Sequence, residues 1–411
     1  MCPMRILLSE GSSLSAREAV TVLGMAGHHL ELVSNDPRCM SSFSRFVKRV
    51  HIVPAPGLDP DGYLEAVLRI AQERRIDVLL PVNEQAYLFS AARGRLPAGL
   101  AVALADFAAF ERVQSKAALS VLLNELDVPQ PPTRILHGPQ ELPADQAFPF
   151  FAKTAYGTAS SGVWRIADRA AWQEKLPLFG ERNLFADGLV VQMPAIGQLH
   201  RTQSVFDRGR LVGIHAYRQL VEGTGGGDVL KLSVKPTAAP LVERIGAALR
   251  WHGALSFDYI VETHSGRPLF IDANPRLVEP VNALLCGVDL AGALVQISLG
   301  QSPPRQPEGK PDVKTRLGLM AVLNAAWRLD TRAAVLSELT RMLARTGRFA
   351  DTVEELTPIR RDYWSAVPFL AVTAAMLISP RLWTRFSGTT IGNYSLTRKS
   401  IDRLKQWAAQ V

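Results

Sequence analysis

Short apolar runs alternate with helical patterns over the first 110 residues, and this alternation limits the possible folds most. Arg5–Leu8 and Asp77–Pro81 are typical of buried strands, while Leu64–Arg74 carries its apolar residues on one face of a helix. Strands that alternate with helices form parallel βαβ units. The first turn, Glu10–Ser13, holds a single glycine, whereas a dinucleotide-binding fingerprint needs three. The pattern therefore predicts a Rossmann-like layout and disfavours NAD binding.

The pattern changes after residue 110. Gln114–Leu126 predicts a helix that ends at a proline-rich break, because proline cannot continue it. Leu255–Glu262 and Pro268–Ala273 predict two strands of a hairpin joined by the turn Thr263–Arg267. We therefore expect an α/β and α+β multi-domain chain with a helical C-terminal extension. The expected parts are an α/β domain at 1–110, two further parts at 111–190 and 191–301, and a helical region at 312–411.

Composition excludes several classes of protein. Apolar residues make up 47% of the 411 residues and charged residues 20%, which is typical of a globular chain and excludes wholesale disorder. The three cysteines have no metal-like spacing, so a disulfide scaffold and a zinc ribbon are excluded and a cytoplasmic location is expected. The net charge is +8, but residues 381–411 hold six basic residues and one acidic residue. A nucleic-acid groove across the main body is therefore not expected.

Two lysines and a loop of small residues predict a phosphate site. Lys116 begins a predicted helix, and Lys153 ends an apolar strand. The loop that follows contains Gly157, Ser160, Ser161 and Gly162. Backbone N–H groups of such a loop can hold phosphate oxygens, and a lysine supplies the opposite charge. Each feature alone is also typical of an ordinary turn or a solvated lysine.

Four polar residues on the predicted hairpin indicate a magnesium site. Asp258 and Asp272 lie on consecutive strands, and pairing of these strands would bring their carboxylates together. Asn274 is two residues beyond Asp272, so both share one face of an extended segment. Carboxylate and amide oxygens suit Mg²⁺, which keeps waters and substrate phosphates as its other ligands. Arg276 adds a guanidinium suited to phosphate or carboxylate.

The ordered set of motifs resembles the ATP-grasp superfamily, in particular the carbamoyl-phosphate-synthetase-like branch of carboxylate–amine ligases. The resemblance covers about residues 4–300. It rests on Ser115-Lys116, Val128–Thr133, Pro149–Lys153 with its Gly/Ser loop, Val190–Gly197, Phe257-Asp258 and Asp272–Arg276.

The resemblance implies that residues 1–110 form a pre-grasp domain, 111–190 a small lid and 191–301 a larger part with the metal site. It places ATP between the lid and the larger part. It assigns the ATP phosphates to Lys116 and Lys153, with the loop of Gly157, Ser160, Ser161 and Gly162 closing over them. It assigns one or two Mg²⁺ or Mn²⁺ ions to Asp258, Asp272 and Asn274, and the transferred phosphoryl group or acyl phosphate to Arg276. The remaining nucleotide contacts would come from Gln192, Met193, Ile196 and His200.

Three positions depart from the family pattern. Asp272 stands where the last motif usually has a glutamate, one methylene longer, and metal binding is expected to persist. The other two remove acidic groups. Met193 stands where the hinge usually has a glutamate, and Leu199-His200 occupy the stretch where an acidic ribose ligand is expected. His200 could contact the ribose, although a plain surface histidine fits equally well.

The function implied by the resemblance is ligation. The chain would use ATP and Mg²⁺ to activate a substrate carboxylate as an acyl phosphate, release ADP, and pass the acyl group to an amine or similar nucleophile. The expected partners are therefore a small carboxylate and an amine, and no nucleic acid. The alternative is a non-catalytic or regulatory ATP-binding protein that keeps the fold, which the two missing acidic groups favour.

The last hundred residues lie outside the resemblance. Trp364–Ile378 has fifteen residues without a charge, fewer than the about 20 that a spanning helix needs. Basic residues flank it, so three interpretations stay open: a helix buried against the body, a peripheral membrane contact through 360–385 at the inner face of the membrane, or a homodimer contact. The segment Ser387–Asn393 predicts a polar loop.

Overall fold

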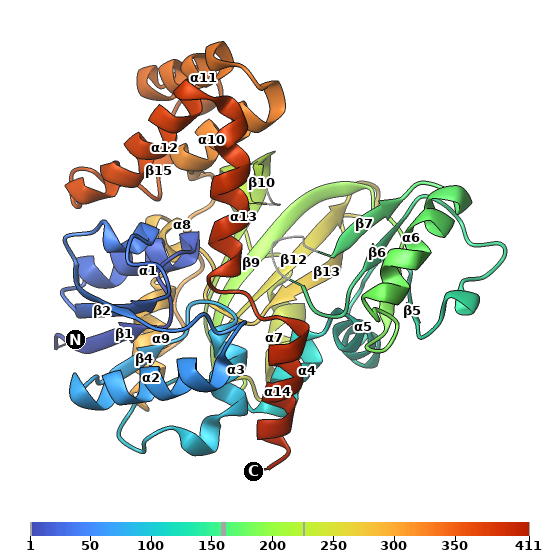
Figure 1. The fold of residues 1–411 in the computed structure, drawn as a ribbon, viewed down its shortest axis with the longest axis horizontal. Helices are drawn as coiled ribbons and strands as arrows, with labels where there is room; N and C mark the ends of the chain where they lie inside the picture. The colour runs from blue at the N-terminus through green and yellow to red at the C-terminus, as the bar shows by residue number, and fades with distance from the viewer. Residues whose placement is uncertain (1, 158–161, 225–226, 411) are drawn as a thin grey trace.

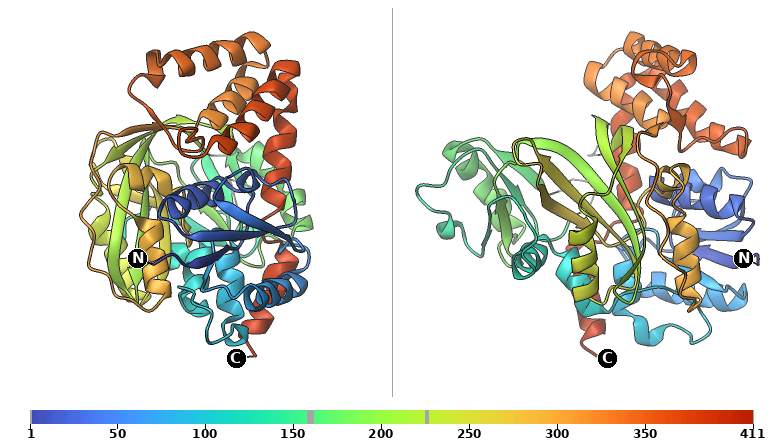
Figure 2. Two further views of the ribbon diagram at one scale, coloured as in Figure 1. Left: turned by 90° about the vertical axis from the view of Figure 1, so that its left-hand side faces the viewer. Right: turned by 180° about the vertical axis from the view of Figure 1, so that it is seen from behind.

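The computed structural model describes residues 2–157, 162–224 and 227–410. Figure 1 shows an N-terminal unit and a lid at opposite sides, with long central strands between them and helices α10–α12 above. Two further views in Figure 2 show the same helices at that end of the molecule. Three sheets, each drawn from its own stretch of chain, organise the protein.

The N-terminal sheet is parallel, as the alternation predicts. Its order is β3-β2-β1-β4, and every neighbouring pair runs in the same direction. The strands are β1 (Arg5–Leu8), β2 (His29–Ser34), β3 (Val47–Ile52) and β4 (Val78–Leu80), and the helices are α1 (Leu14–Met25), α2 (Pro60–Glu73) and α3 (Gln85–Ala91). The apolar run Ile6–Leu8 is fully buried, which is why it forms the centre of this sheet.

The lid sheet is antiparallel, in the order β5-β8-β6-β7. Its strands are β5 (Thr133–Leu136), β6 (Phe150–Lys153), β7 (Val163–Ile166) and β8 (Leu189–Gln192), and the helices of this stretch are α4 (Phe107–Gln114), α5 (Lys116–Glu125) and α6 (Arg169–Glu181). On α6, Trp172 packs its ring against Phe150 of β6, and Phe179 packs its ring against Trp164 of β7, at centroid distances of 5.8 and 5.0 Å. These aromatic contacts hold α6 on the lid sheet.

The central sheet has the order β13-β12-β9-β10-β11-β14-β15. Its first five members along the chain are β9 (Gly197–Asp207), β10 (Arg210–Glu222), β11 (Asp228–Val234), β12 (Gly253–Glu262) and β13 (Pro268–Asn274), with helices α7 (Ala239–Ala248), α8 (Pro280–Leu285) and α9 (Leu290–Ser298). The mixture of parallel and antiparallel sheets confirms the predicted α/β and α+β class.

The C-terminal region is mainly helical, as expected, and two short strands add to the central sheet. These are β14 (Lys314–Arg316), which pairs with β11, and β15 (Val353–Glu354), which pairs with β14. The helices are α10 (Gly318–Leu329), α11 (Arg332–Ala344), α12 (Ala366–Ile378), α13 (Trp383–Gly392) and α14 (Arg398–Ala408). No helix among the described residues is both long and apolar enough to cross a membrane.

The polar loop predicted at Ser387–Asn393 is wrong, since α13 continues to Gly392. Serine, glycine and threonine have low helix propensity, which favoured the loop. Tertiary packing overrides that preference, because α13 begins at Trp383, whose ring packs 6.3 Å from that of Trp327 on α10.

The C-terminal region is joined to the N-terminal unit by buried polar contacts. Arg17 of α1 donates to Asp362 at 2.9 Å, and both side chains are at most 1% exposed. Asp362 also accepts from the Ser44 hydroxyl at 2.6 Å and from the backbone N–H of Arg45 at 3.0 Å. These contacts fix the C-terminal helices relative to the rest of the chain.

Candidate functional site

The predicted hairpin places its two carboxylates opposite each other. Asp258 of β12 pairs directly with Asp272 of β13, and Ser256 pairs with Asn274. Lys116, the first residue of α5, puts its Nζ 2.5 Å from Asp272 Oδ1. This ion pair joins two residues of the predicted site that are 156 positions apart in the sequence.

Arg201 of β9 was missed by the sequence analysis. It lies directly opposite Asp258 in the sheet, and its Nε is 3.2 Å from Asp258 Oδ1. It also forms an ion pair with Asp228 of β11. Burial would lower the pKa of Arg201, but Asp258 and Asp228 outweigh it and raise that pKa well above its usual value. No local signal distinguishes it, because β9 also carries His200, Thr202 and Gln203.

Lys153 ends β6 in a buried position beside the same hairpin. Its Nζ donates to Gln192 Oε1 at 2.7 Å and to the carbonyl of Ile271 at 3.0 Å. Burial lowers the pKa of Lys153 to about 8, and the nearby Lys116 adds to this, while Asp272 and Asp258 oppose it. The ammonium group is therefore desolvated without a carboxylate in direct contact.

The side chains of Gln192 and Met193, both expected to contact the nucleotide, point to different parts of the structure. Gln192 lies beside Lys153, with its Nε2 donating to Thr133 Oγ1 at 3.0 Å. The side chain of Met193 packs on the lid core instead and accepts a hydrogen bond from Gln146 at 3.4 Å. Its backbone N–H donates to the carbonyl of Pro132 at 2.9 Å, so Met193 offers a ligand only its own carbonyl.

Ile196 directly precedes β9, and His200 belongs to this strand. Ile196 is 72% exposed and accepts from the N–H of Thr263 at the β12–β13 turn. This turn is five residues from Asp258, or about 16 Å along a strand, so the structure does not bring Ile196 to the carboxylates. His200 packs 5.7 Å from the ring of Tyr259, and burial lowers its pKa to about 4.

The glycine loop is described only at its ends. Ser160 and Ser161 lie outside the described residues. Gly162 has φ +80°, which favours glycine, and its carbonyl accepts from the N–H of Thr154 at 2.9 Å. Gly157 lines a second cavity of about 210 Å³ that lies between the lid and the segment joining α13 and α14.

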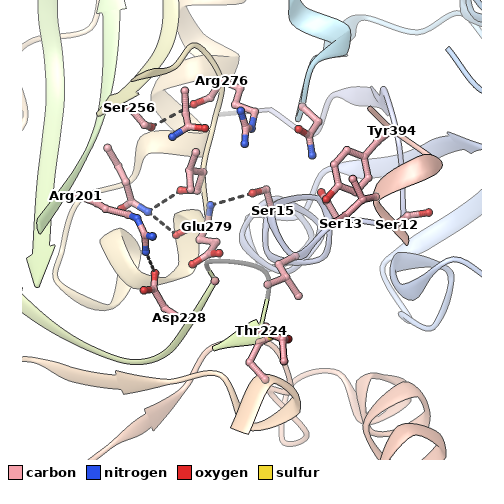
Figure 3. Close-up of a pocket in the computed structure, with 18 of the residues that line it drawn as sticks. Ser12, Ser13, Ser15, Arg201, Thr224, Asp228, Ser256, Arg276, Glu279 and Tyr394 are labelled. Carbon is pink, nitrogen blue, oxygen red and sulfur yellow. Dashed lines mark hydrogen bonds and ion pairs between the residues drawn. The ribbon is translucent and has the colours of Figure 1, made fainter. Parts of the chain in front are cut away.

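A cavity of about 310 Å³ opens beside the paired carboxylates. Asp258, Asp272, Asn274 and Arg276 line it from the hairpin, and Ser12, Ser13 and Ser15 line it from the start of α1. Figure 3 shows Arg276, Ser256, Arg201, Glu279 and Asp228 at one side of this cavity, and Ser12, Ser13 and Tyr394 at the other. None of the described residues forms a hydrogen bond or ion pair with the guanidinium of Arg276, so its charge is available to an anion.

Comparisons with known proteins agree with this architecture. No protein-family model matches the chain. The carbamoyl phosphate synthase large chain of Thermus thermophilus is 24% identical over 323 residues, which cover 73% of this chain and 30% of the relative. The arginine-specific large chain of Geobacillus stearothermophilus is 21% identical over 324 residues. This chain therefore spans about a third of the length of these relatives.

Solved structures match the fold more fully. The N5-carboxyaminoimidazole synthetase of Staphylococcus aureus, complexed with ADP, has a TM-score of 0.60 at 12% identity and covers 79% of this chain and 85% of its own. The biotin carboxylase domain of the Hydrogenobacter thermophilus 2-oxoglutarate carboxylase, with MgADP and bicarbonate, has a TM-score of 0.62 at 14% identity and covers 76% and 74%. The chain has the ATP-grasp fold. This confirms the resemblance that the motifs carry.

The residues of this candidate site fit a divalent cation. Burial raises the pKa of Asp258, and the charges of Asp272 and Asp228 add to this, against the opposing charge of Arg201. Two neighbouring carboxylates and the Asn274 amide form an all-oxygen set, which suits Mg²⁺. In the described structure Lys116 and Arg201 balance these acids, so a cation would take the place of one of these contacts.

A second buried cluster of charges contacts the candidate site through Glu279. The fully buried Lys231 of β11 forms ion pairs with Glu279 and, at 2.7 Å, with Glu355. Burial raises the pKa of Glu18 well above its usual value, and the charge of Glu355 adds to this. Glu279 also lines the cavity, so Lys231 holds a cavity carboxylate in place.

Proposed function

We propose that this ATP-grasp protein is an ADP-forming ligase that uses ATP and Mg²⁺ to activate a substrate carboxylate as an acyl phosphate. The carrying observation is that Asp258, Asp272 and Asn274 line one cavity together with Arg276, which has no partner among the described residues. Mg²⁺ would be held by Asp258, Asp272 and Asn274 and would neutralise phosphate charge. The ADP complexes among the matched structures support this proposal.

The remaining roles follow from the contacts of each side chain. Lys116 and Lys153 would bind ATP phosphates, exchanging their present contacts with Asp272 and Gln192. Gln192, the backbone of Met193, His200, Ile196, Gly157, Ser160, Ser161 and Gly162 complete the proposed nucleotide site. Arg276 would hold the γ-phosphoryl group and the incoming carboxylate, because a guanidinium binds both through paired N–H groups.

The proposed reaction has two steps. A carboxylate oxygen of the substrate attacks the γ-phosphorus, and the bond to the bridging oxygen of ADP breaks. The nitrogen of an amine then attacks the acyl carbon, inorganic phosphate leaves, and the nitrogen gives up a proton. Positioning and charge stabilisation supply the catalysis, so no covalent bond to the protein is needed.

Product analysis tests the proposal. We would incubate the protein with Mg-ATP and pools of carboxylic acids, with hydroxylamine as a trap. ADP and a hydroxamate support acyl-phosphate chemistry, whereas AMP and pyrophosphate refute it. ATP binding without any product would favour the non-catalytic alternative.

Peripheral membrane contact through 360–385 is a further part of the proposal. Trp364, Leu370 and Ile378 are 49%, 60% and 68% exposed, and exposed arginines flank them. Apolar and basic residues on one surface suit anionic lipid. Flotation with phosphatidylserine-containing vesicles, but not with pure phosphatidylcholine, would support this contact. A homodimer stays a prediction that light scattering tests.

A further inference from the structure

The cavity beside the carboxylates has an apolar wall built by the C-terminal helices. Leu319, Met320 and Leu323 of α10 and Val372 of α12 line it, and each is at most 7% exposed. All four belong to one hydrophobic core cluster, which also contains Met376. The wall is therefore a fixed, packed surface of the protein.

Leu14 and Met40 extend this wall into the N-terminal unit. Both line the cavity and pack against the same hydrophobic cluster. The buried pair of Arg17 and Asp362 holds the two units together next to it. A ligand in the cavity would therefore contact apolar side chains from two parts of the chain.

The opposite end of the cavity is polar and has unused hydrogen-bonding capacity. Gln203 is 1% exposed, and its Nε2 donates to the carbonyls of Val278 and Glu279 at 2.6 and 3.0 Å. This fixes its Oε1 as an acceptor, which has no partner among the described residues, and the same holds for Asn83 Oδ1. Buried acceptors of this kind require a donor from water or a ligand. Arg276 supplies the positive charge at this end.

We propose that the acid activated at this site is a small amphipathic carboxylic acid. Its carboxylate lies at Arg276, a neighbouring N–H or O–H group donates to Gln203, and an uncharged aliphatic or aromatic body lies against Leu319, Leu323 and Val372. The assignment of this acid as the activated substrate rests on the proposed function; its binding mode rests on the cavity alone.

Charge and size limit the ligand further. Among the residues that the structure describes, those of the C-terminal region that line the cavity carry no charge. A second carboxylate on the aliphatic or aromatic part of the acid would therefore lose its water without gaining a charged partner. The volume of about 310 Å³ lies at the lower end of the range for small-molecule pockets. A single short chain or ring fits this range.

Binding of matched acids tests the inference without any turnover. Acetate, butyrate, hexanoate and adipate would be titrated by calorimetry into the full chain with Mg²⁺ and the β,γ-imido analogue of ATP. We expect binding to tighten about two- to fourfold for each added CH₂ group. Hexanoate should bind more than tenfold more tightly than adipate, which has the same chain length and a second carboxylate.

Two isosteric variants test the wall itself. Leu323→Asn and Val372→Thr each introduce a polar group without a large change in volume, and the second is the milder if the first fails to fold. Both should weaken hexanoate at least threefold and leave acetate unchanged. Leu336→Asn is the control, because Leu336 is 50% exposed on α11 and does not line the cavity.

The results also separate this inference from the proposed function. Affinity that is independent of chain length, equal binding of hexanoate and adipate, no binding of any acid, or equal weakening of acetate and hexanoate by the wall variants would each overturn the inference. A clear chain-length dependence without any hydroxamate would uphold the binding mode and refute the ligase. Equal hydroxamate formation from acetate, adipate and hexanoate would uphold the ligase and overturn the amphipathic substrate.

Discussion

Replacing Asp362 by alanine should release the C-terminal helices from the N-terminal unit. The substitution leaves the 1% exposed Arg17 guanidinium without its carboxylate partner, which was 2.9 Å away. Breaking a buried ion pair in this way costs about 3–5 kcal/mol. The Ser44 hydroxyl and the Arg45 N–H also lose their acceptor, which costs about 1–3 kcal/mol for each buried group.

These costs share one site and do not simply add, so we expect a loss of at least about 4 kcal/mol. That is a large part of the about 5–15 kcal/mol that stabilises a typical protein. The loss acts on one contact surface, so local opening of the region around Asp362 should precede global unfolding.

Hydrogen exchange measures this local opening directly. Amides of α10 and α12 should exchange about a thousandfold faster in Asp362→Ala, since each 1.4 kcal/mol is a factor of ten. The control is Asp330→Ala, which removes an ion pair with Arg381 at 3.1 Å whose partners are 49% and 85% exposed. Such an exposed pair contributes at most about 1 kcal/mol. Equal exchange in the two variants would refute the reasoning.

Three further predictions concern single ionisable groups. Burial lowers the pKa of Lys153 to about 8, so the affinity for ATP should fall as the pH rises through 8 and this lysine loses its charge. The Lys153→Arg variant should not show this fall when ATP is titrated at pH values from 6.5 to 9.5. The raised pKa of Glu18 means that the folded protein keeps a proton which the unfolded chain releases above pH 4.5. The free energy of unfolding should therefore fall as the pH rises above 4.5, and Glu18→Gln should flatten this dependence in urea titrations. Asp272→Ala should abolish Mg²⁺-dependent ADP formation while circular dichroism shows a folded protein.

Each of these predictions has an outcome that contradicts it. A pH-independent ATP affinity in the unsubstituted protein would exclude the role of Lys153. A Glu18→Gln protein with the same slope of stability against pH would mean that Glu18 is ionised in the fold. Full turnover by a folded Asp272→Ala protein would remove Asp272 from the metal site.

Local sequence patterns predicted the parts of the site that lie on one hairpin. The turn Thr263–Arg267 sets the pairing of Tyr259 with Phe270. A register shift at the next residue then puts Asp258 opposite Asp272, where regular pairing would have placed Ile271. The N-terminal strands were also predictable, because runs such as Ile6–Leu8 are apolar throughout and fully buried.

Contacts across long sequence separations were not predictable in the same way. Nothing near Arg201 in the sequence indicates that it pairs with both Asp258 and Asp228, since this depends on the order of four strands. Likewise, Leu323 and Val372 line the cavity only because the C-terminal region docks beside α1. The predicted boundaries at 110, 190 and 301 remain a proposal.

Under the proposed function, the last helix should give nucleotide entry a dependence on ionic strength. Arg398 at the start of α14 forms an ion pair with Asp187 of the lid, and Lys405 lies over the ring of Tyr156, 4.7 Å from its centroid. Any outward swing of the lid has to separate these charges. Arg398 is 43% exposed, so the pair contributes at most about 1 kcal/mol, or about a fivefold bias toward the closed arrangement. Because added salt screens such a pair, ATP should associate faster in 0.5 M than in 0.05 M sodium chloride. Salt usually has the opposite effect, since it slows the association of an anion with a basic protein.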